Sequence, residues 1–263
     1  MRHATPGGVL NPRWNLTAAL AAHDLKNVLA PVHVDRSDFV IASMSRPAEE
    51  VGGDFFVLVP REHGLCVVIG DVCGAGRGAA QISTRIQPHV YALAHLMNDP
   101  SELLTALNRV AAGLVPQDRF ITAAALELDG EHGGLSIANA GHVPAMIRRK
   151  SGGTIIVGRA SGPPLGMLRR ARYECARNAL AVSDVTVLMT DGVLEAIEDD
   201  LTTMRTLAGL LAEAPDGADA INHSIYSIVD RRRDQTKSDD RTLLSIERSP
   251  RRFAPTLSRR AGT

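Results

Sequence analysis

Two apolar runs separated by a short turn constrain the fold of this chain more than any other feature. The runs are residues 55–59 and 65–69, and the segment between them contains proline and glycine. Runs of β-forming residues on either side of turn residues predict an antiparallel hairpin. Asp54 comes just before the first run and Asp71 shortly after the second. Because a hairpin brings these two ends together, we expect both carboxylates at one end of a sheet.

Glycine surrounds both aspartates within residues 50–78. Gly52 and Gly53 precede Asp54, and the run Gly70-Asp71-Val72-Cys73-Gly74-Ala75-Gly76-Arg77-Gly78 surrounds Asp71. Glycine accepts positive φ and lets the backbone approach a ligand closely. This end of the hairpin therefore predicts half of a metal site.

The rest of the chain alternates between groups of strands and pairs of helices. Strands are predicted near residues 39–42, 120–128, 135–138, 144–148, 154–157, 173–180, 185–189 and 242–246, and helices near 79–97, 101–114, 202–213 and 217–231. We expect a kink or break near Gln87 because Pro88 follows it, and an N-cap at Pro100-Ser101 for the next helix. Strands joined by short turns favour antiparallel pairing, and paired helices favour layers that cover sheets. The predicted fold class is α+β.

Composition excludes several classes of function. The chain has 29 basic and 29 acidic residues in 263, which gives no overall attraction to nucleic acid or to anionic membranes. No apolar run approaches the length of a membrane span, and no signal peptide is evident. Three cysteines are too few and too scattered for a disulfide framework or a zinc site. We expect a cytoplasmic protein with no membrane span.

Four features in all bear on a metal site, because each places a carboxylate beside a predicted strand. They are Asp54, Asp71, Asp191 in Thr190-Asp191-Gly192, and the pair Asp239-Asp240. Any one of them alone is typical of a turn or a solvated loop. Clustered carboxylates, however, raise one another's pKa unless a cation neutralises them. Sites made only of oxygen ligands prefer Mg²⁺, Mn²⁺ or Ca²⁺, and two such ions form a common hydrolytic centre.

These motifs resemble the PP2C-type metal-dependent protein phosphatases, and within them the bacterial branch similar to SpoIIE and RsbU. The residues that carry the resemblance are Arg46-Pro47-Ala48, Glu50 to Asp54, Gly70 to Gly76, Phe120-Ile121-Thr122, Asn139 to His142, Gly162 to Gly166, Thr190 to Ala196, and Asp239 to Leu244. The resemblance implies a four-layer α-β-β-α sandwich over residues 38–248, in which two antiparallel sheets are flanked by helix pairs.

The resemblance also implies roles for particular residues. Asp71 would bridge two Mn²⁺ or Mg²⁺ ions, with the main-chain carbonyl of Val72 as a further ligand. Asp191 and Asp239 would complete the first metal site, and Asp54 would hold the second ion directly or through water. Hydroxide between the two ions would attack phosphoserine or phosphothreonine in line, without a phosphoenzyme. Asp239 is preferred over its neighbour because the next position is often Asn in the wider family.

The implied function is a serine/threonine protein phosphatase acting on a phosphorylated STAS-domain anti-sigma-factor antagonist. Two alternatives stay open: a regulatory binding module of the same fold with little turnover, and a hydrolase of small phosphoesters. The first alternative is motivated by Val57, where this branch commonly has an acidic residue, and by the short stretch before the first strand. Asn139 and His142 are expected to cap a turn and pack in the core, and Arg46 is a candidate for binding phosphate.

The two ends of the chain are expected to lie outside the phosphatase domain. Residues 1–37 form an N-terminal segment in which 14–29 have helical spacing. This linker helix could form a homodimer or dock on a partner protein. Residues 249–263 are predicted to be a disordered basic tail.

Overall fold

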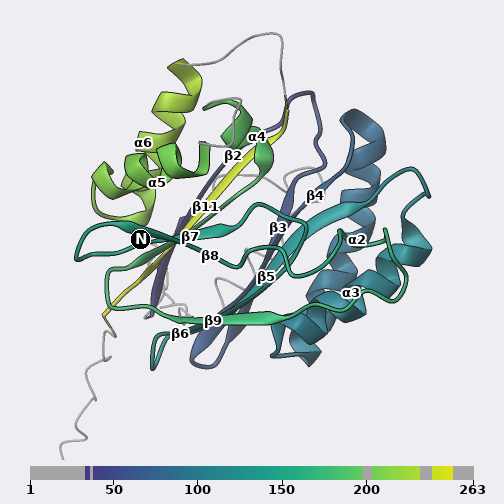
Figure 1. Ribbon diagram of the computed structural model, residues 1–263, viewed down its shortest axis with the longest axis horizontal. Coiled ribbons are helices and arrows are strands. Elements are labelled where there is room, and N and C mark those ends of the chain that lie inside the picture. The colour runs from purple at the N-terminus through teal and green to yellow at the C-terminus, as the bar shows by residue number, and fades with distance from the viewer. Residues whose placement is uncertain (1–32, 36–37, 198–202, 232–238, 251–263) are drawn as a thin grey trace, which may run out of the picture.

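Two antiparallel sheets packed face to face form the centre of the molecule (Figure 1). The computed structural model describes residues 33–35, 38–197, 203–231 and 239–250. Sheet A contains, in spatial order, β1 (His33–Asp35), β2 (Phe39–Arg46), β11 (Arg241–Arg248), β10 (Val185–Met189), β7 (Ala145–Arg148) and β8 (Thr154–Val157). Sheet B contains β3 (Phe55–Arg61), β4 (Gly64–Val72), β5 (Ile121–Asp129), β6 (Gly134–Ala140) and β9 (Cys175–Ala179). Sheet A joins strands from distant parts of the chain, since β2 pairs with β11, whereas β3 to β6 of sheet B are neighbours in the order in which they follow one another in the sequence.

Helices cover the outer face of each sheet. On sheet B lie α2 (Gly76–Leu96) and α3 (Pro100–Leu114), and on sheet A lie α5 (Thr203–Glu213) and α6 (Ala218–Arg231) (Figure 1). The short helix α4 (Asp191–Glu195) follows β10. This arrangement confirms the predicted four-layer α-β-β-α sandwich.

The apolar alternation along the strands explains why three core layers form. In β4, Val67 and Ile69 face the layer between the two sheets, whereas Cys66 and Val68 face α2 and α3. Successive side chains of a strand point to opposite faces, so an unbroken apolar run is buried on both sides. The continuous apolar composition of this strand therefore fits its place in the middle of the sandwich.

Two details of the helices differ from the sequence prediction. The sequence predicts a kink or break near Gln87, and helix α2 continues through Pro88, so a break does not occur. Its apolar face stays buried on both sides of the proline, and this packing favours the helix despite the lost hydrogen bond. Helix α3 is capped by Asp99, whose carboxylate accepts hydrogen bonds from the N–H groups of Ser101 and Glu102. The predicted cap at Pro100-Ser101 is one residue too late, because Pro100 occupies the first helical position.

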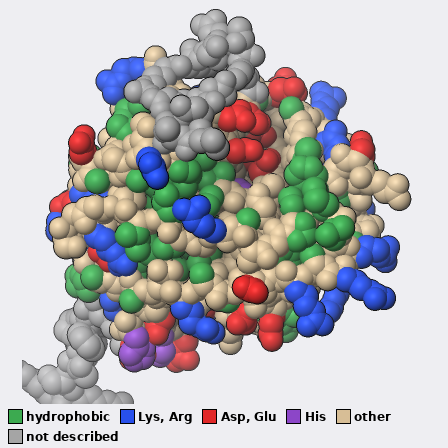
Figure 2. Space-filling view, in the orientation of Figure 1, with side chains coloured by type: hydrophobic (Ala, Val, Ile, Leu, Met, Phe, Trp, Pro, Cys, Tyr) green, Lys and Arg blue, Asp and Glu red, His purple; other side chains and the backbone are tan. Residues whose placement is uncertain are grey.

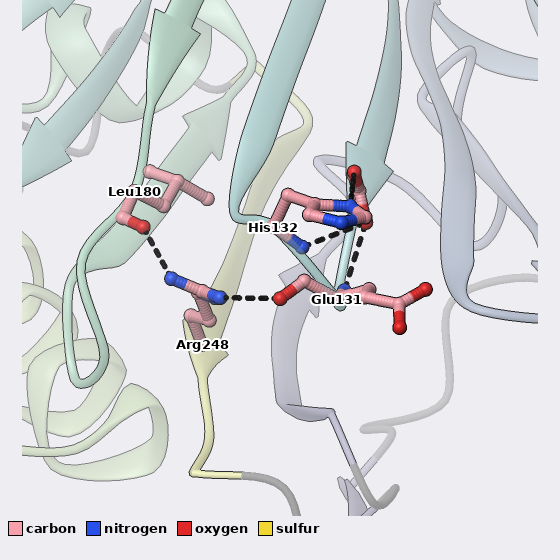
Figure 3. A network of polar contacts seen from close by, with 5 residues as sticks. Glu131, His132, Leu180 and Arg248 are labelled. Atoms are coloured by element: carbon pink, nitrogen blue, oxygen red, sulfur yellow. Dashed lines mark hydrogen bonds and ion pairs between the residues drawn. The ribbon is translucent and has the colours of Figure 1, made fainter.

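Side-chain contacts also close the end of the sandwich where β11 finishes. Arg248 donates hydrogen bonds to the carbonyls of Leu180 at 2.7 Å and Glu131 at 3.1 Å (Figure 3). The turn that contains Glu131 is itself held by Asp129, which accepts from the N–H groups of Glu131 and His132. These contacts connect β11 of sheet A to the β5–β6 turn of sheet B.

Some predictions fall on parts of the chain that the structure does not describe. The predicted linker helix at 14–29 lies outside the described residues, as do residues 251–263 of the predicted tail 249–263. Among the helices of the described ranges, none is long and apolar enough to cross a membrane.

Candidate metal centre

The β3–β4 hairpin brings Asp54 and Asp71 to the same end of sheet B. Phe55 pairs with Gly70 in this hairpin, so the aspartates that flank this pair on either strand are neighbours. The hairpin prediction is confirmed, since β3 and β4 are antiparallel and adjacent. The two carboxylates are close enough to interact electrostatically, because the charge of Asp71 helps to raise the pKa of Asp54.

Sheet A supplies the second group of carboxylates. Met189 at the end of β10 pairs with Leu243 near the start of β11. Asp191 follows the first strand and Asp239 precedes the second, so both lie beyond the same end of sheet A. Negative charge at these two residues raises the pKa of Asp71, which shows that the two sheets present their carboxylates to one another.

Asp54 is held between the two sheets. Its side chain is buried, and Oδ2 accepts hydrogen bonds from the hydroxyl groups of Thr190 at 2.8 Å and Thr242 at 2.7 Å. The other oxygen, Oδ1, is buried and has no hydrogen-bond partner among the described residues. Burial and the charge of Asp71 hold the pKa of Asp54 well above its ordinary value. A buried carboxylate oxygen without a donor fits contact with a cation or with water bound to one.

Asp71 lies against a backbone that has no room for side chains. Burial, followed by the charges of Asp191 and Asp239, raises the pKa of Asp71 to about 7. A Cβ atom added at Gly53 would lie 2.9 Å from the carbonyl oxygen of Val72 and 3.3 Å from Oδ1 of Asp71. Glycine is therefore needed at position 53 because the chain passes directly beside two predicted ligands.

A third carboxylate that the sequence analysis did not select joins Asp191 and Asp239. Ligand atoms of Asp191, Glu195 and Asp239 all lie within 4.8 Å of one another, and the three side chains are exposed. Asp191 begins α4 and Glu195 follows one turn later on the same helix. Residues four apart share one face of a helix, so this spacing was the signal in the sequence.

The adjacent aspartates at the start of β11 have different environments. Both carboxylate oxygens of Asp240 accept backbone N–H groups, from Ala48 at 2.8 Å and Gly53 at 2.6 Å, and the side chain is buried. Asp239 is exposed and its Oδ1 accepts only the N–H of Asp240 among the hydrogen bonds of the described residues. The exposed carboxylate of Asp239 is therefore the better candidate for a ligand, whereas Asp240 holds the loop before Asp54 through its two hydrogen bonds.

Asn139 and His142 hold a turn beside the centre, as expected. The Asn139 side chain bonds to the backbone N–H and carbonyl of His142 and to the carbonyl of Gly158. Nδ1 of His142 lies 2.8 Å from the hydroxyl of Thr122, the residue paired with Asp71. Burial lowers the pKa of His142 to about 4, so this imidazole is neutral near pH 7.

Arg46 is engaged away from the carboxylates. Its guanidinium forms a 2.5 Å ion pair with Asp230 and lies 5.4 Å from the centre of the Tyr226 ring. Both partners belong to α6, so this arginine serves the packing of that helix. The structure gives no support to its candidacy for binding phosphate.

The donor set as a whole fits hard divalent cations. Carboxylates from both sheets converge at one end of the sandwich, and acidic side chains gather near the top of the face shown in Figure 2. Such a cluster destabilises the ionised state of its own members, and Mg²⁺ or Mn²⁺ would relieve that repulsion. The unpaired oxygen of Asp54 and the tightly packed carbonyl of Val72 are compatible with the same occupants.

Known proteins share both the sequence pattern and the fold. The chain is 28% identical over 210 residues to the phosphoserine phosphatase RsbU of Bacillus subtilis (strain 168), covering 79% of this chain and 63% of that protein. It is 27% identical over 214 residues to the phosphoserine phosphatase RsbP of the same organism, covering 79% of this chain and 52% of that protein. The chain thus spans less than two thirds of the length of either relative.

Solved structures show the same architecture at lower sequence identity. The RsbU and RsbW domains of a Mycobacterium tuberculosis protein superpose with a TM-score of 0.73 at 23% identity, over 86% of this chain and 64% of that one. The PP2C phosphatase domain of SpoIIE from Bacillus subtilis, with a fragment of its regulatory domain, gives 0.72 at 17% identity, over 82% and 64%. The family described as Stage II sporulation protein E (SpoIIE) matches residues 61–249. The chain therefore belongs to the SpoIIE family and has the fold of the PP2C phosphatase domain.

Proposed function

We propose that this chain is a metal-dependent phosphatase of serine/threonine phosphoproteins. The observation that supports this most strongly is the convergence of Asp54 and Asp71 from one sheet with Asp191 and Asp239 from the other. The names of the relatives RsbU and RsbP, both phosphoserine phosphatases, point to the same chemistry. Membership of the SpoIIE family agrees with it.

The residues divide the work of holding two Mg²⁺ or Mn²⁺ ions. Asp71 and the Val72 carbonyl would contribute ligands to both ions, Asp191 and Asp239 would help to hold one of them, and Asp54 would help to hold the other. Thr190 and Thr242 would orient Asp54 by donating to Oδ2, and Oδ1, which has no hydrogen-bond partner among the described residues, would be available to the ion. The ions, when bound, would activate water as a nucleophile and withdraw charge from the phosphoryl group.

Phosphate release from a phosphoserine protein tests the proposal. We expect release by the wild type with Mn²⁺, none after chelation, and a loss of at least about 100-fold in Asp71→Asn. Asp219→Asn is a matched control, since this exposed carboxylate lies on α6. Equal release by the wild type and Asp71→Asn would refute the proposal.

For the substrate, we propose a phosphorylated anti-sigma-factor antagonist with a STAS domain. This proposal rests on the resemblance to the RsbU-like branch. It can be distinguished by experiment from the alternative function, hydrolysis of small phosphoesters. A phosphorylated STAS protein should be dephosphorylated with a kcat/KM far above that for nucleotides or sugar phosphates. Comparable values for both classes would favour the small-molecule alternative.

The alternative of a binding module with little turnover gains no support from Val57. This residue lies in the middle of β3, opposite Val68, and packs against the core between sheet B and its helices. It does not belong to the carboxylate cluster, so the change from an acidic residue removes no group from that cluster. Calorimetry that shows two bound Mn²⁺ ions without phosphate release from any phosphoprotein would revive this alternative.

A further inference from the structure

The connection between β8 and β9 presents an unusual surface. Residues 162–172, which we call the 162–172 loop, include three exposed arginines and two exposed apolar side chains. The arginines are Arg169, Arg170 and Arg172, and the apolar residues are Met167, 50% exposed, and Leu168, 59% exposed. Arginine and methionine are enriched in protein interfaces, where guanidinium groups and flexible apolar side chains can both be buried.

Hydrogen bonds anchor the first half of this loop despite its exposure. Leu165 and Ile121 exchange two backbone hydrogen bonds, of 2.7 and 3.0 Å. Asn108 of α3 accepts from the N–H of Gly166 at 2.9 Å and donates to the carbonyl of Leu168 at 2.8 Å. A surface that is already ordered loses little conformational entropy when a partner binds.

The anchor of the loop lies beside the candidate metal centre. Ile121 pairs with Val72, and the next residue pairs with Asp71. Helix α2 leads away from the centre and α3 returns, so the C-terminal half of α3, which carries Asn108, is on the same side. The 162–172 loop therefore borders the centre from the side of β5.

Arg119 lies against the glycine-rich segment that follows Asp71. A Cβ added at Gly74 or Gly78 would come within 3.1 Å of its guanidinium, and Nη1 donates a long hydrogen bond of 3.5 Å to the carbonyl of Cys73. Arg119 comes two residues before Ile121, which pairs with Leu165 of the loop, so it adds a basic group between this anchor and the carboxylates in the order of the chain.

None of these four arginines is ion-paired with a carboxylate in the part of the chain that the structure describes. Elsewhere in that part, arginines 46, 61, 148 and 149 each have a carboxylate partner. Basic groups thus gather beside a cluster of carboxylates without contacting it. An approaching protein with acidic side chains would be repelled by the metal-free centre and attracted by this neighbouring surface.

We propose that Arg119 and the 162–172 loop form a docking surface for a protein substrate that carries acidic side chains close to its phosphorylated residue. The arginines would pair with these carboxylates, and Met167 and Leu168 would contact apolar groups between them. This inference rests on the proposed phosphatase function, and it specifies that the substrate is acidic around its phosphorylated residue.

Two phosphoserine peptides of equal length test the inference, one with Asp and Glu around the phosphoserine and one with Lys and Arg. The variant is Arg169→Glu with Arg170→Glu, and the control is Arg205→Glu with Arg231→Glu. The control changes the net charge equally on α5 and α6, in the opposite outer layer. Circular dichroism melts verify that both double variants are folded.

The wild type is expected to prefer the acidic peptide in kcat/KM, through a lower KM. The loop variant should lower the ratio of acidic to basic peptide by about tenfold, with the difference shrinking at high salt. Arg119→Gln should lower the same ratio by a smaller factor, and the control should keep the wild-type ratio. An unchanged ratio in the loop variant would overturn the inference.

The failure of the docking surface can be distinguished from failure of the proposed function. Turnover of p-nitrophenyl phosphate with Mn²⁺ by the wild type reports the function without engaging a protein-sized surface. If there is no turnover, fluorescence anisotropy of the two labelled peptides still tests docking. Weaker binding of the acidic peptide to the loop variant than to the control supports the inference, and equal binding refutes it.

Discussion

Removal of the Asp240 side chain should destabilise the metal-free protein, whereas removal of the adjacent Asp239 side chain should leave its stability nearly unchanged. Asp240 accepts two backbone hydrogen bonds, a buried one from Gly53 and a partly buried one from Ala48. A hydrogen bond to a charged group contributes about 1.5–3 kcal/mol, and its removal leaves a buried N–H without a partner. Asp240→Ala should therefore lower the free energy of unfolding by about 3–5 kcal/mol, a large part of the ordinary 5–15 kcal/mol.

The measurement is thermal unfolding followed by circular dichroism, first in chelator and then in Mn²⁺. At roughly 2–4 °C per kcal/mol for a domain of this size, Asp240→Ala should melt at least about 6 °C below the wild type in chelator. Relief of the repulsion that Asp240 exerts on Asp54 and Asp71 will offset part of this loss. Asp239→Ala should melt within about 2 °C of the wild type in chelator, because its side chain is exposed.

Added Mn²⁺ should separate the two variants further. It should raise the melting temperature of the wild type much more than that of Asp239→Ala, because the variant lacks one of the proposed ligands. The reasoning is refuted if Asp240→Ala melts with the wild type in chelator. It is also refuted if Asp239→Ala keeps the full stabilisation by Mn²⁺.

Three further predictions concern the same centre. Gly53→Ala should weaken Mn²⁺ binding by about tenfold in calorimetry, since the new methyl group would displace the Val72 carbonyl. Gly113→Ala is the control, because a Cβ there meets nothing within 4 Å, and unchanged affinity in Gly53→Ala would contradict the prediction. Glu195→Gln should reduce Mn²⁺ affinity by about tenfold without changing the melting temperature in chelator; full affinity would exclude this side chain as a ligand. The stabilisation by Mn²⁺ should increase between about pH 6 and pH 8. The pKa of Asp71 is raised to about 7 in the folded metal-free protein. Between the ordinary pKa of an aspartate and pH 7, the folded protein therefore binds more protons than the unfolded chain, and this difference stabilises the folded state. The metal-free protein consequently loses this contribution as the pH rises through 7, while Mn²⁺ no longer has to displace a proton, and a pH-independent shift in melting temperature would contradict this account.

Local patterns allowed the elements and the first half of the site to be predicted. The β3–β4 hairpin depends on residues close in the sequence, so its turn and its apolar runs were sufficient to place Asp54 beside Asp71. The helix pairs were likewise visible from apolar spacing. The break near Gln87 was wrong because the sequence pattern could not weigh burial of the helix against one lost hydrogen bond. Glu195 was missed although its spacing from Asp191 was readable, since nothing local indicated which face of α4 meets Asp239.

By itself, the sequence determined which segments are strands and helices, and which residues carry acidic groups next to them. These properties follow from the period of side chains along each element and from turn residues, which act over a few positions. Only the tertiary structure decided which carboxylates are buried and hydrogen-bonded and which are exposed. Thr190 and Thr242 reach Asp54 across 136 and 188 residues of chain, and Asp240 reaches Gly53 across 187. Contacts of that range depend on how two sheets pack against each other, and that packing separates the structural role of Asp240 from the exposed carboxylate of Asp239.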